Sequence, residues 1–175
     1  MSKTLVNILL SILLLVPAQA IIFNNLILFN VAVPLVFIYV IISLPVTLGT
    51  NTSLTLAFIT GLAVDIFGDT QGVNALACTL LAFARKPVYH LYMSFDDDLA
   101  GMRPSLRTMG YAPYMKYLLT MTLLYCFMVF AIEAFQFHNF SLMLLRIVCS
   151  TIFTFVIIYA IDSLSIRQRQ REKKL

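Results

Sequence analysis

Long apolar runs, separated by short polar or turn-forming pieces, constrain this chain more than any other feature. Crossing the roughly 30 Å hydrocarbon core of a bilayer takes about 20 mostly apolar residues in a helix. Of the residues, 61% are hydrophobic and 11% are charged, whereas soluble domains have about 45–50% and about 25%. The sequence therefore predicts an all-α integral membrane protein with six transmembrane helices. The runs are about Leu5–Ala20, Val31–Leu48, Ser53–Phe67, Val73–Tyr92, Tyr114–Phe135 and Phe140–Ile161.

The basic residues fall on one side of this predicted topology. Eleven of the twelve lie near the two ends of the chain or around the polar connection Met93–Ala112, and the twelfth is Arg146. The opposite connections, at about 21–30, 68–72 and 136–139, contain none. Because cytoplasmic loops are enriched in Lys and Arg, we predict a multi-pass membrane protein with both termini in the cytoplasm. The net charge of +4 then reflects topology and does not indicate a nucleic-acid partner.

A single transmembrane domain over 1–164 is expected, followed by a basic cytoplasmic tail at 165–175. The tail contains the stretch RQRQREKKL, which suits either anionic lipid headgroups, at about 1 kcal/mol per basic residue, or a plain topology anchor.

The N-terminus also resembles a secretory signal peptide. Lys3 precedes the apolar run, and Ala18-Gln19-Ala20 has the small-residue spacing of a cleavage site. Cleavage there would leave five spans and an N-terminus outside. Retention is the favoured interpretation, because a single lysine precedes the run and apolar residues resume at once after Ala20.

Three ionisable residues are expected at one depth in the membrane. With the predicted orientation, Asp65, Glu133 and Arg146 all lie towards the outer surface. An isolated charge at the bilayer centre costs about 2.5–3.5 kcal/mol on insertion scales, so such residues face the bundle interior and pair. We predict that Arg146 pairs with Glu133, with Asp65 or with both. A structural ion pair is favoured over the alternative, a substrate or proton site.

Residue spacing predicts which helix faces turn inward. Ala57 and Gly61 form a small-xxx-small pair, and Asp65 continues the same face, so a neighbouring helix can approach closely there. In the sixth run, Ser150 and Thr154 extend a polar stripe from the arginine at helical spacing.

Residue patterns typical of catalysis are absent from the sequence. The acidic stretch Phe95–Leu99 lacks the ligand spacing of a metal loop, and His90 and His138 are expected on opposite sides of the membrane. No nucleophile elbow, P-loop or Cys/His framework is present. No catalytic residue, metal or cofactor is therefore predicted, and the cysteines are interpreted as small apolar fillers. They are Cys78, Cys126 and Cys149.

Three motifs in order resemble one known family. FIYVIISLP at Phe37–Pro45 is followed by Gly61-Leu62 with Asp65, and GVNALA at Gly72–Ala77 opens the next run. In these motifs, and in length, run count and basic tail, the chain resembles the MreD family of rod shape-determining proteins, in its Bacteroidetes-type form. The resemblance covers nearly the whole chain.

The resemblance implies a non-enzymatic scaffold of the bacterial cell-elongation complex, organising lateral peptidoglycan synthesis. The implied partners are MreC by direct contact, MreB, a glycosyltransferase and transpeptidase of the complex, and membrane lipids. Candidate structural and docking positions from the motifs and the charges are Gly61, Asp65, Gly72, Asn74, Glu133 and Arg146.

The same resemblance raises an alternative. The family fold is similar to the six-helix substrate-binding subunits of energy-coupling-factor vitamin transporters, so a vitamin-binding subunit is the second candidate. Those subunits dock through an A-x-x-x-A face on the first helix, and the leucine-rich run Leu5–Ala20 lacks it. That difference favours the scaffold.

Overall fold

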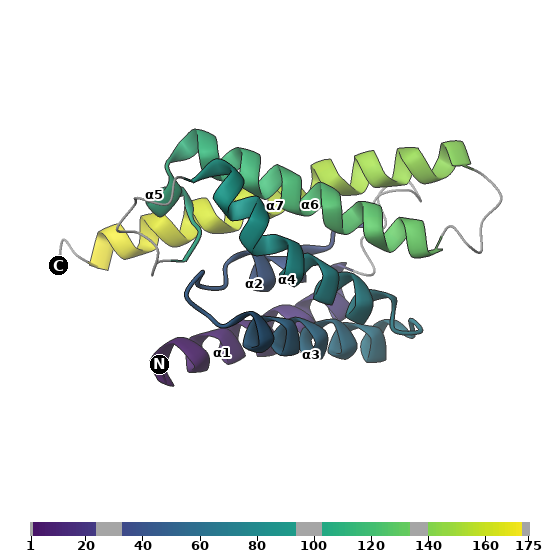
Figure 1. The fold of residues 1–175 in the computed structure, drawn as a ribbon, viewed down its shortest axis with the longest axis horizontal. Helices are drawn as coiled ribbons and strands as arrows, with labels where there is room; N and C mark the ends of the chain where they lie inside the picture. The colour runs from purple at the N-terminus through teal and green to yellow at the C-terminus, as the bar shows by residue number, and fades with distance from the viewer. Residues whose placement is uncertain (1, 24–32, 94–102, 134–139, 173–175) are drawn as a thin grey trace.

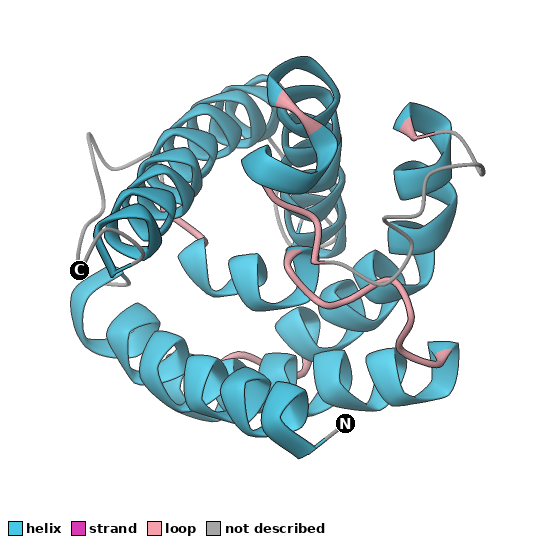
Figure 2. Cartoon of the chain, turned by 90° about the vertical axis from the view of Figure 1, so that its left-hand side faces the viewer, coloured by secondary structure: helices cyan, strands magenta, loops and turns pink. Residues whose placement is uncertain are grey.

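The computed structural model describes residues 2–23, 33–93, 103–133 and 140–172. At 2–7, 9, 22–23, 107, 133, 140, 142 and 164–172 it describes the backbone alone. These residues form helices and loops without a strand (Figure 2), so the all-α prediction is confirmed for the described part of the chain. The elements are α1 (Ser2–Ala18), η1 (Gln19–Phe23), η2 (Val36–Ile38), α2 (Tyr39–Ile42), α3 (Thr50–Gly68), α4 (Val73–Tyr92), α5 (Leu106–Met109), α6 (Tyr111–Glu133) and α7 (Phe140–Glu172).

The long helices form two layers with α2 between them (Figure 1). Helices α1 and α3 lie on one side and α6 and α7 on the other, while α4 crosses from the first layer to the second. Helix α3 packs on α4, α4 on α6 and α6 on α7. Helix α1 begins and α7 ends at the same end of the molecule, on the left in Figure 1.

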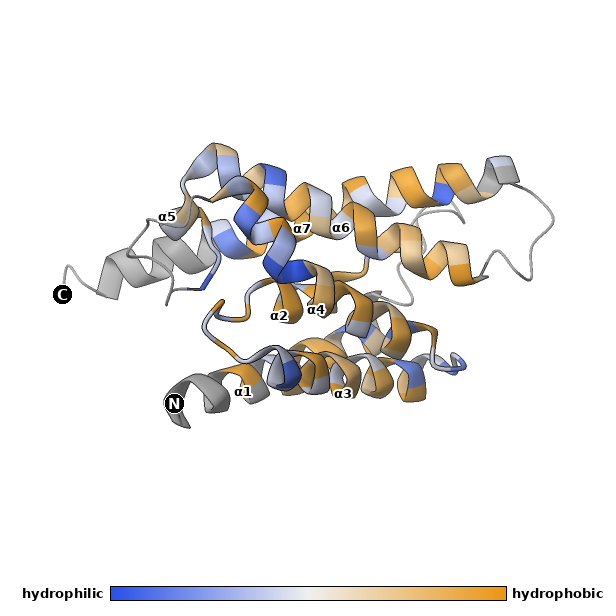
Figure 3. Ribbon diagram, in the orientation of Figure 1, coloured by the Kyte–Doolittle hydropathy of each residue, from blue (hydrophilic) through white to orange (hydrophobic). Residues whose placement is uncertain are grey.

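Three described helical stretches are long and apolar enough to cross a membrane: Thr50–Gly68, Tyr111–Ile132 and Met143–Ser163. Apolar residues run along the long helices, whereas polar residues gather at the ends of the molecule and on the second half of α4 (Figure 3). Large apolar side chains point outward on every long helix, as expected where lipid replaces water. Examples are Leu13, Ile66, Phe83, Phe127 and Ile152. The chain is a multi-pass membrane protein.

The second apolar run differs from the expected helix over 31–48. Within its described part, 33–48, the helical residues are Val36–Ile42, in one 3-10 turn and one α turn. Pro34 and Pro45 bracket them, and proline removes a backbone donor and breaks helices. We call Val33–Leu48 the central segment, because it is largely buried between the two layers.

Candidate functional site

The turn between α3 and α4 depends on two residues with left-handed backbone. Asp69 ends α3 with φ of 51°, and Gly72 precedes α4 with φ of 79°. Aspartate tolerates this region better than most residues, and glycine adopts it without steric cost. Asp69 itself is exposed. The turn therefore reverses the chain within four residues and sets α3 and α4 antiparallel.

Asp65, which is only 4% exposed, accepts hydrogen bonds from donors of its own hairpin. Its Oδ1 accepts from the Asn74 backbone N (3.0 Å), from Asn74 Nδ2 (2.9 Å) and from the Thr70 hydroxyl. Its Oδ2 accepts from the Ala75 backbone N (2.8 Å). The first N–H groups of a helix lack intrahelical partners and favour negative charge. A carboxylate from the end of α3 therefore caps the start of α4.

Gly61 allows the two helices to approach closely enough for this cap. A Cβ at position 61 would lie 2.5 Å from the Asn74 carbonyl oxygen and 2.6 Å from Ala75 Cα. No real side chain fits at such distances, so the backbones of α3 and α4 are in direct contact here. The predicted close-approach face, with Ala57 and Gly61 buried, thus meets the first turn of α4.

The hairpin continues by contacts into α6 and the central segment. Tyr125 of α6 is fully buried and donates its hydroxyl to Asn74 Oδ1 (2.7 Å). Its ring meets that of Phe37 edge-on, with centroids 5.7 Å apart. We call Gly61, Asp65, Asn74 and Tyr125 the hairpin latch, because they hold three helices and the central segment together.

The structure separates the six predicted site residues into two groups. Gly61, Asp65, Gly72 and Asn74 come together in one hairpin, and their role in hairpin architecture and partner docking stays a prediction. The predicted Asp65–Arg146 ion pair is replaced in the described residues by the neutral donors of the hairpin. The side chain of Glu133 lies outside the described residues, so its pairing with Arg146, which is partly buried on α7, stays a prediction.

The polar stripe on α7 contacts the central segment. Ser150 and Thr154 are fully buried. Ser150 Oγ accepts from the Val33 backbone N (3.1 Å), and Thr154 Oγ1 accepts from the Leu35 backbone N (3.0 Å). Irregular backbone at membrane depth is tolerated only when the protein itself satisfies its polar groups. The stripe does this for the residues that precede η2.

Gln19 supplies the next two hydrogen bonds of the central segment. Its buried carboxamide donates from Nε2 to the Pro34 carbonyl (2.8 Å) and accepts at Oε1 from the Val36 backbone N (3.0 Å). Gln19 opens the π-helical turn after α1. The middle residue of the apparent cleavage motif is thus part of the core.

Arg85 of α4 contacts the other end of the central segment. Its guanidinium, on a side chain 1% exposed, donates to the Leu44 carbonyl, to the Pro45 carbonyl (3.3 and 3.2 Å) and to Ser53 Oγ (3.3 Å). Its Nε is buried without a hydrogen-bond partner. Cations near helix C-termini satisfy free carbonyls, and Arg85 does so where α2 ends.

A buried carboxylate joins the central segment to the connection before α6. Asp162 of α7 is 4% exposed. It accepts at Oδ1 from the Tyr39 hydroxyl (3.0 Å) and at Oδ2 from the Leu106 backbone N (3.3 Å). Leu106 opens α5, whose first turn has a capping box formed by Ser105 and Thr108. Asp162 therefore ties α7, α2 and α5 to one another.

Sequence reasoning missed Gln19, Arg85 and Tyr125. Gln19 was assigned only to a cleavage motif and Arg85 only to the charge count. The two prolines were the available signal, since a helix broken inside a membrane demands side-chain partners for its backbone.

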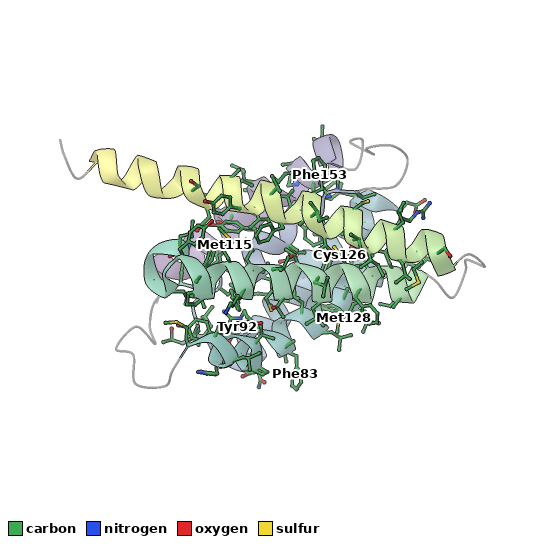
Figure 4. All side chains as sticks on the ribbon, turned by 90° about the horizontal axis from the view of Figure 1, so that it is seen from above. Phe83, Tyr92, Met115, Cys126, Met128 and Phe153 are labelled. Carbon is green, nitrogen blue, oxygen red and sulfur yellow. The ribbon has the colours of Figure 1, made fainter. Side chains whose placement is uncertain are left out.

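The contacts described above are hydrogen bonds and packing contacts between parts of the fold. Among them, no group of three His, Cys, Asp or Glu side chains is placed to hold a metal ion. Cys78 and Cys126 are fully buried, and Cys126 lies between α6 and α7 (Figure 4). The acidic stretch Phe95–Leu99 and His138 lie outside the described residues, so the expectations for them stay predictions.

The chain was compared with protein families, with curated proteins and with solved structures. No protein-family model, curated protein or solved structure matches this chain.

Proposed function

We propose that this protein is a non-enzymatic scaffold of the bacterial inner membrane, an MreD-like component of the cell-elongation complex. The observation that carries the proposal is the environment of Asp65. Asp65 is a buried ionisable group in an apolar helix, and such groups in membrane proteins often bind substrates or transfer protons. It accepts four hydrogen bonds within its hairpin, about as many as a carboxylate can accept. A carboxylate so engaged supports a role in architecture and not in substrate binding or proton transfer.

The other buried polar groups support the same role. Side chains from η1, α4 and α7 hydrogen-bond the backbone of the central segment, and Tyr117 of α6 donates to the Ile42 carbonyl (3.3 Å). Six crossings with both termini in the cytoplasm form part of the proposal. The common end of α1 and α7 and the eleven basic residues predicted on that side support it.

Partner binding is proposed on the lipid-facing side of α3, beside the latch. Exposed apolar side chains there include Phe58, Ile59, Leu62 and Ile66. The proposed direct partner is MreC, with MreB and the peptidoglycan-synthesising pair in the same complex.

Depletion in the native host combined with crosslinking tests the proposal. Depletion should convert rods to round cells. A photoreactive amino acid at Ile66, which is 72% exposed, should crosslink to MreC, whereas the same amino acid at Val64, 5% exposed, should not. Unchanged cell shape together with a vitamin co-purifying in stoichiometric amount would contradict the scaffold and favour the transporter subunit.

A further inference from the structure

Helix α4 is too polar to cross a membrane on the strength of its own composition. All 20 of its residues are described, but it is not among the three stretches that are long and apolar enough to cross. Arg85 and Lys86 follow its first twelve residues, 73–84. Twelve residues of helix span about 18 Å, whereas the hydrocarbon core is about 30 Å thick. A crossing α4 therefore carries both charges into the membrane.

The apolar residues of α4 do not compensate for two charges. On insertion scales, one Arg or Lys near the centre of a helix outweighs roughly four to twelve Leu, Ile, Phe or Val residues. Helix α4 contains seven residues of these four kinds, so they offset about one charge. The second charge needs another source of stability.

Hydrogen bonds to earlier parts of the chain supply that stability. Lys86 donates to Thr50 Oγ1 (3.2 Å) at the start of α3. Arg85 donates to Ser53 Oγ (3.3 Å) of the same helix and to the carbonyls at the end of α2. At the other end of the hairpin, Asp65 caps the first turn of α4. Each of these partners precedes α4 in the sequence.

The order of synthesis gives these contacts a consequence. Because the chain is made from its N-terminus, α3 and the end of α2 are present when α4 reaches the membrane, whereas α6 and α7 are not. Charged side chains are tolerated in a membrane when they face protein groups. We propose that α4 crosses the membrane only as the second half of a hairpin with α3, held by the Gly61 contact and the Asp65 cap. The proposal uses the crossing of α4 in the proposed function, but not the elongation complex.

Cysteine labelling of the full-length protein in cells tests this proposal. Asp69→Cys marks the turn before α4 and Tyr111→Cys marks the chain after it, and both positions are exposed. When α4 crosses, a membrane-impermeant maleimide reaches one of the two positions before lysis, whichever way the protein is oriented. When α4 fails to cross, the reagent reaches both or neither. Protein without either substitution gives the background from the three native cysteines.

A variant that breaks the hairpin makes the test specific. Gly61→Leu with Asp65→Leu removes the close contact and the cap, yet makes α3 more apolar. The difference in labelling between the two marked positions should fall about tenfold, equivalent to about 1.4 kcal/mol. The control T52L/T55L adds two leucines at exposed positions of α3 and should keep the wild-type difference.

A second pair of substitutions should reverse the defect. K86L/H90L, added to G61L/D65L, leaves α4 with one charge, which its apolar residues can offset. Lys86 makes an exposed bond and His90 is exposed, so the contacts of Arg85 stay in place. We expect the wild-type labelling pattern to return. If G61L/D65L is degraded in cells, the amount of full-length protein in the membrane should return instead.

A G61L/D65L variant that labels like the wild type would overturn the proposal. So would a failure of K86L/H90L to restore either labelling or protein amount, or a wild type in which positions 69 and 111 label on the same side. These outcomes concern the path of the chain and not cell shape. The depletion experiment can therefore fail while this proposal holds, and the reverse is also true.

Discussion

At the scale of single residues, Asp65 shows how a membrane helix can carry an acidic residue at little cost. The carboxylate lies beside the free N–H groups of the next helix, and the close approach at Gly61 brings those groups within 3.0 Å. Burial of a carboxylate is costly unless hydrogen bonds replace its hydration. Here the backbone of Asn74 and Ala75 supplies part of that replacement, so the charge stabilises the fold.

Substitution of Asp65 by Asn should destabilise the hairpin. An amide keeps one acceptor but turns an NH2 group towards a backbone N–H, so the variant should lose about 2 kcal/mol. Thermal unfolding in detergent, followed by circular dichroism, measures the change. Asp69→Asn is the matched control, because Asp69 is exposed and asparagine also tolerates its φ of 51°. Equal melting temperatures for the two variants would contradict the capping role.

Gly61→Ala should destabilise the protein by overpacking. The new methyl group would overlap the backbone of Asn74 and Ala75, and such overpacking costs about 1–3 kcal/mol. The same thermal measurement applies. Gly49→Ala is the control, since its Cβ would meet Thr52 Oγ1 at an ordinary 3.7 Å. A Gly61→Ala variant as stable as the control would show that α3 and α4 do not touch here.

At the scale of elements, the central segment differs most from the sequence-based expectation. Its apolar residues predicted a helix over 31–48, whereas four neighbouring elements supply the hydrogen bonds that a continuous helix would have made internally. Pro34 and Pro45, which break the helix, can be seen in the sequence. The side chains that hydrogen-bond the backbone of the segment cannot be identified from it, because Thr154 and Leu35 are 119 residues apart and Arg85 and Leu44 are 41 apart.

Exchanging the two neighbouring basic residues tests the contact at the end of α2. Arg85→Lys keeps the charge, but a lysine ammonium cannot reproduce the planar fork that reaches Leu44, Pro45 and Ser53. We expect a loss of about 2–3 kcal/mol, measured as a lower melting temperature. Lys86→Arg, the control, should be near neutral because Lys86 makes an exposed bond to Thr50 (3.2 Å). If Arg85→Lys leaves the melting temperature unchanged, the positive charge alone matters at this position.

At the scale of the whole molecule, α1 belongs to the packed structure. Gln19 bridges Pro34 and Val36, and Ile8 and Val16 are buried against the other elements. Removing α1 together with Gln19 would leave backbone groups of the central segment without partners within the membrane, where each unsatisfied group costs several kcal/mol.

We therefore predict that the mature protein keeps its first helix. Mass spectrometry of peptides from protein purified from the native membrane should recover the segment that precedes Ile21. Gln19→Ala should keep that segment but lower stability, because the Pro34 carbonyl and the Val36 N–H lose their partners. A mature chain that begins at Ile21 would refute the six-span topology.

Cysteine labelling tests the proposed orientation. Asp69 and Tyr111 are exposed near opposite ends of the long helices. A membrane-impermeant maleimide should label Asp69→Cys in cells with a permeabilised outer membrane, and should label Tyr111→Cys only after lysis. Labelling in the reverse pattern would invert the topology and place both termini outside.

The sequence by itself predicted an all-α membrane protein, the position of the α3–α4 turn and the face of small residues on α3 that packs closely against α4. These properties depend on apolar runs, on turn residues and on spacing within one helix, all of which are visible over a few residues. Tertiary structure alone decided the partners of Asp65 and Arg85, the groups that hydrogen-bond the backbone of the central segment and the inclusion of Gln19 in the core. In a membrane, a buried polar group is stable only beside a complementary one, and which groups become neighbours depends on how distant segments pack.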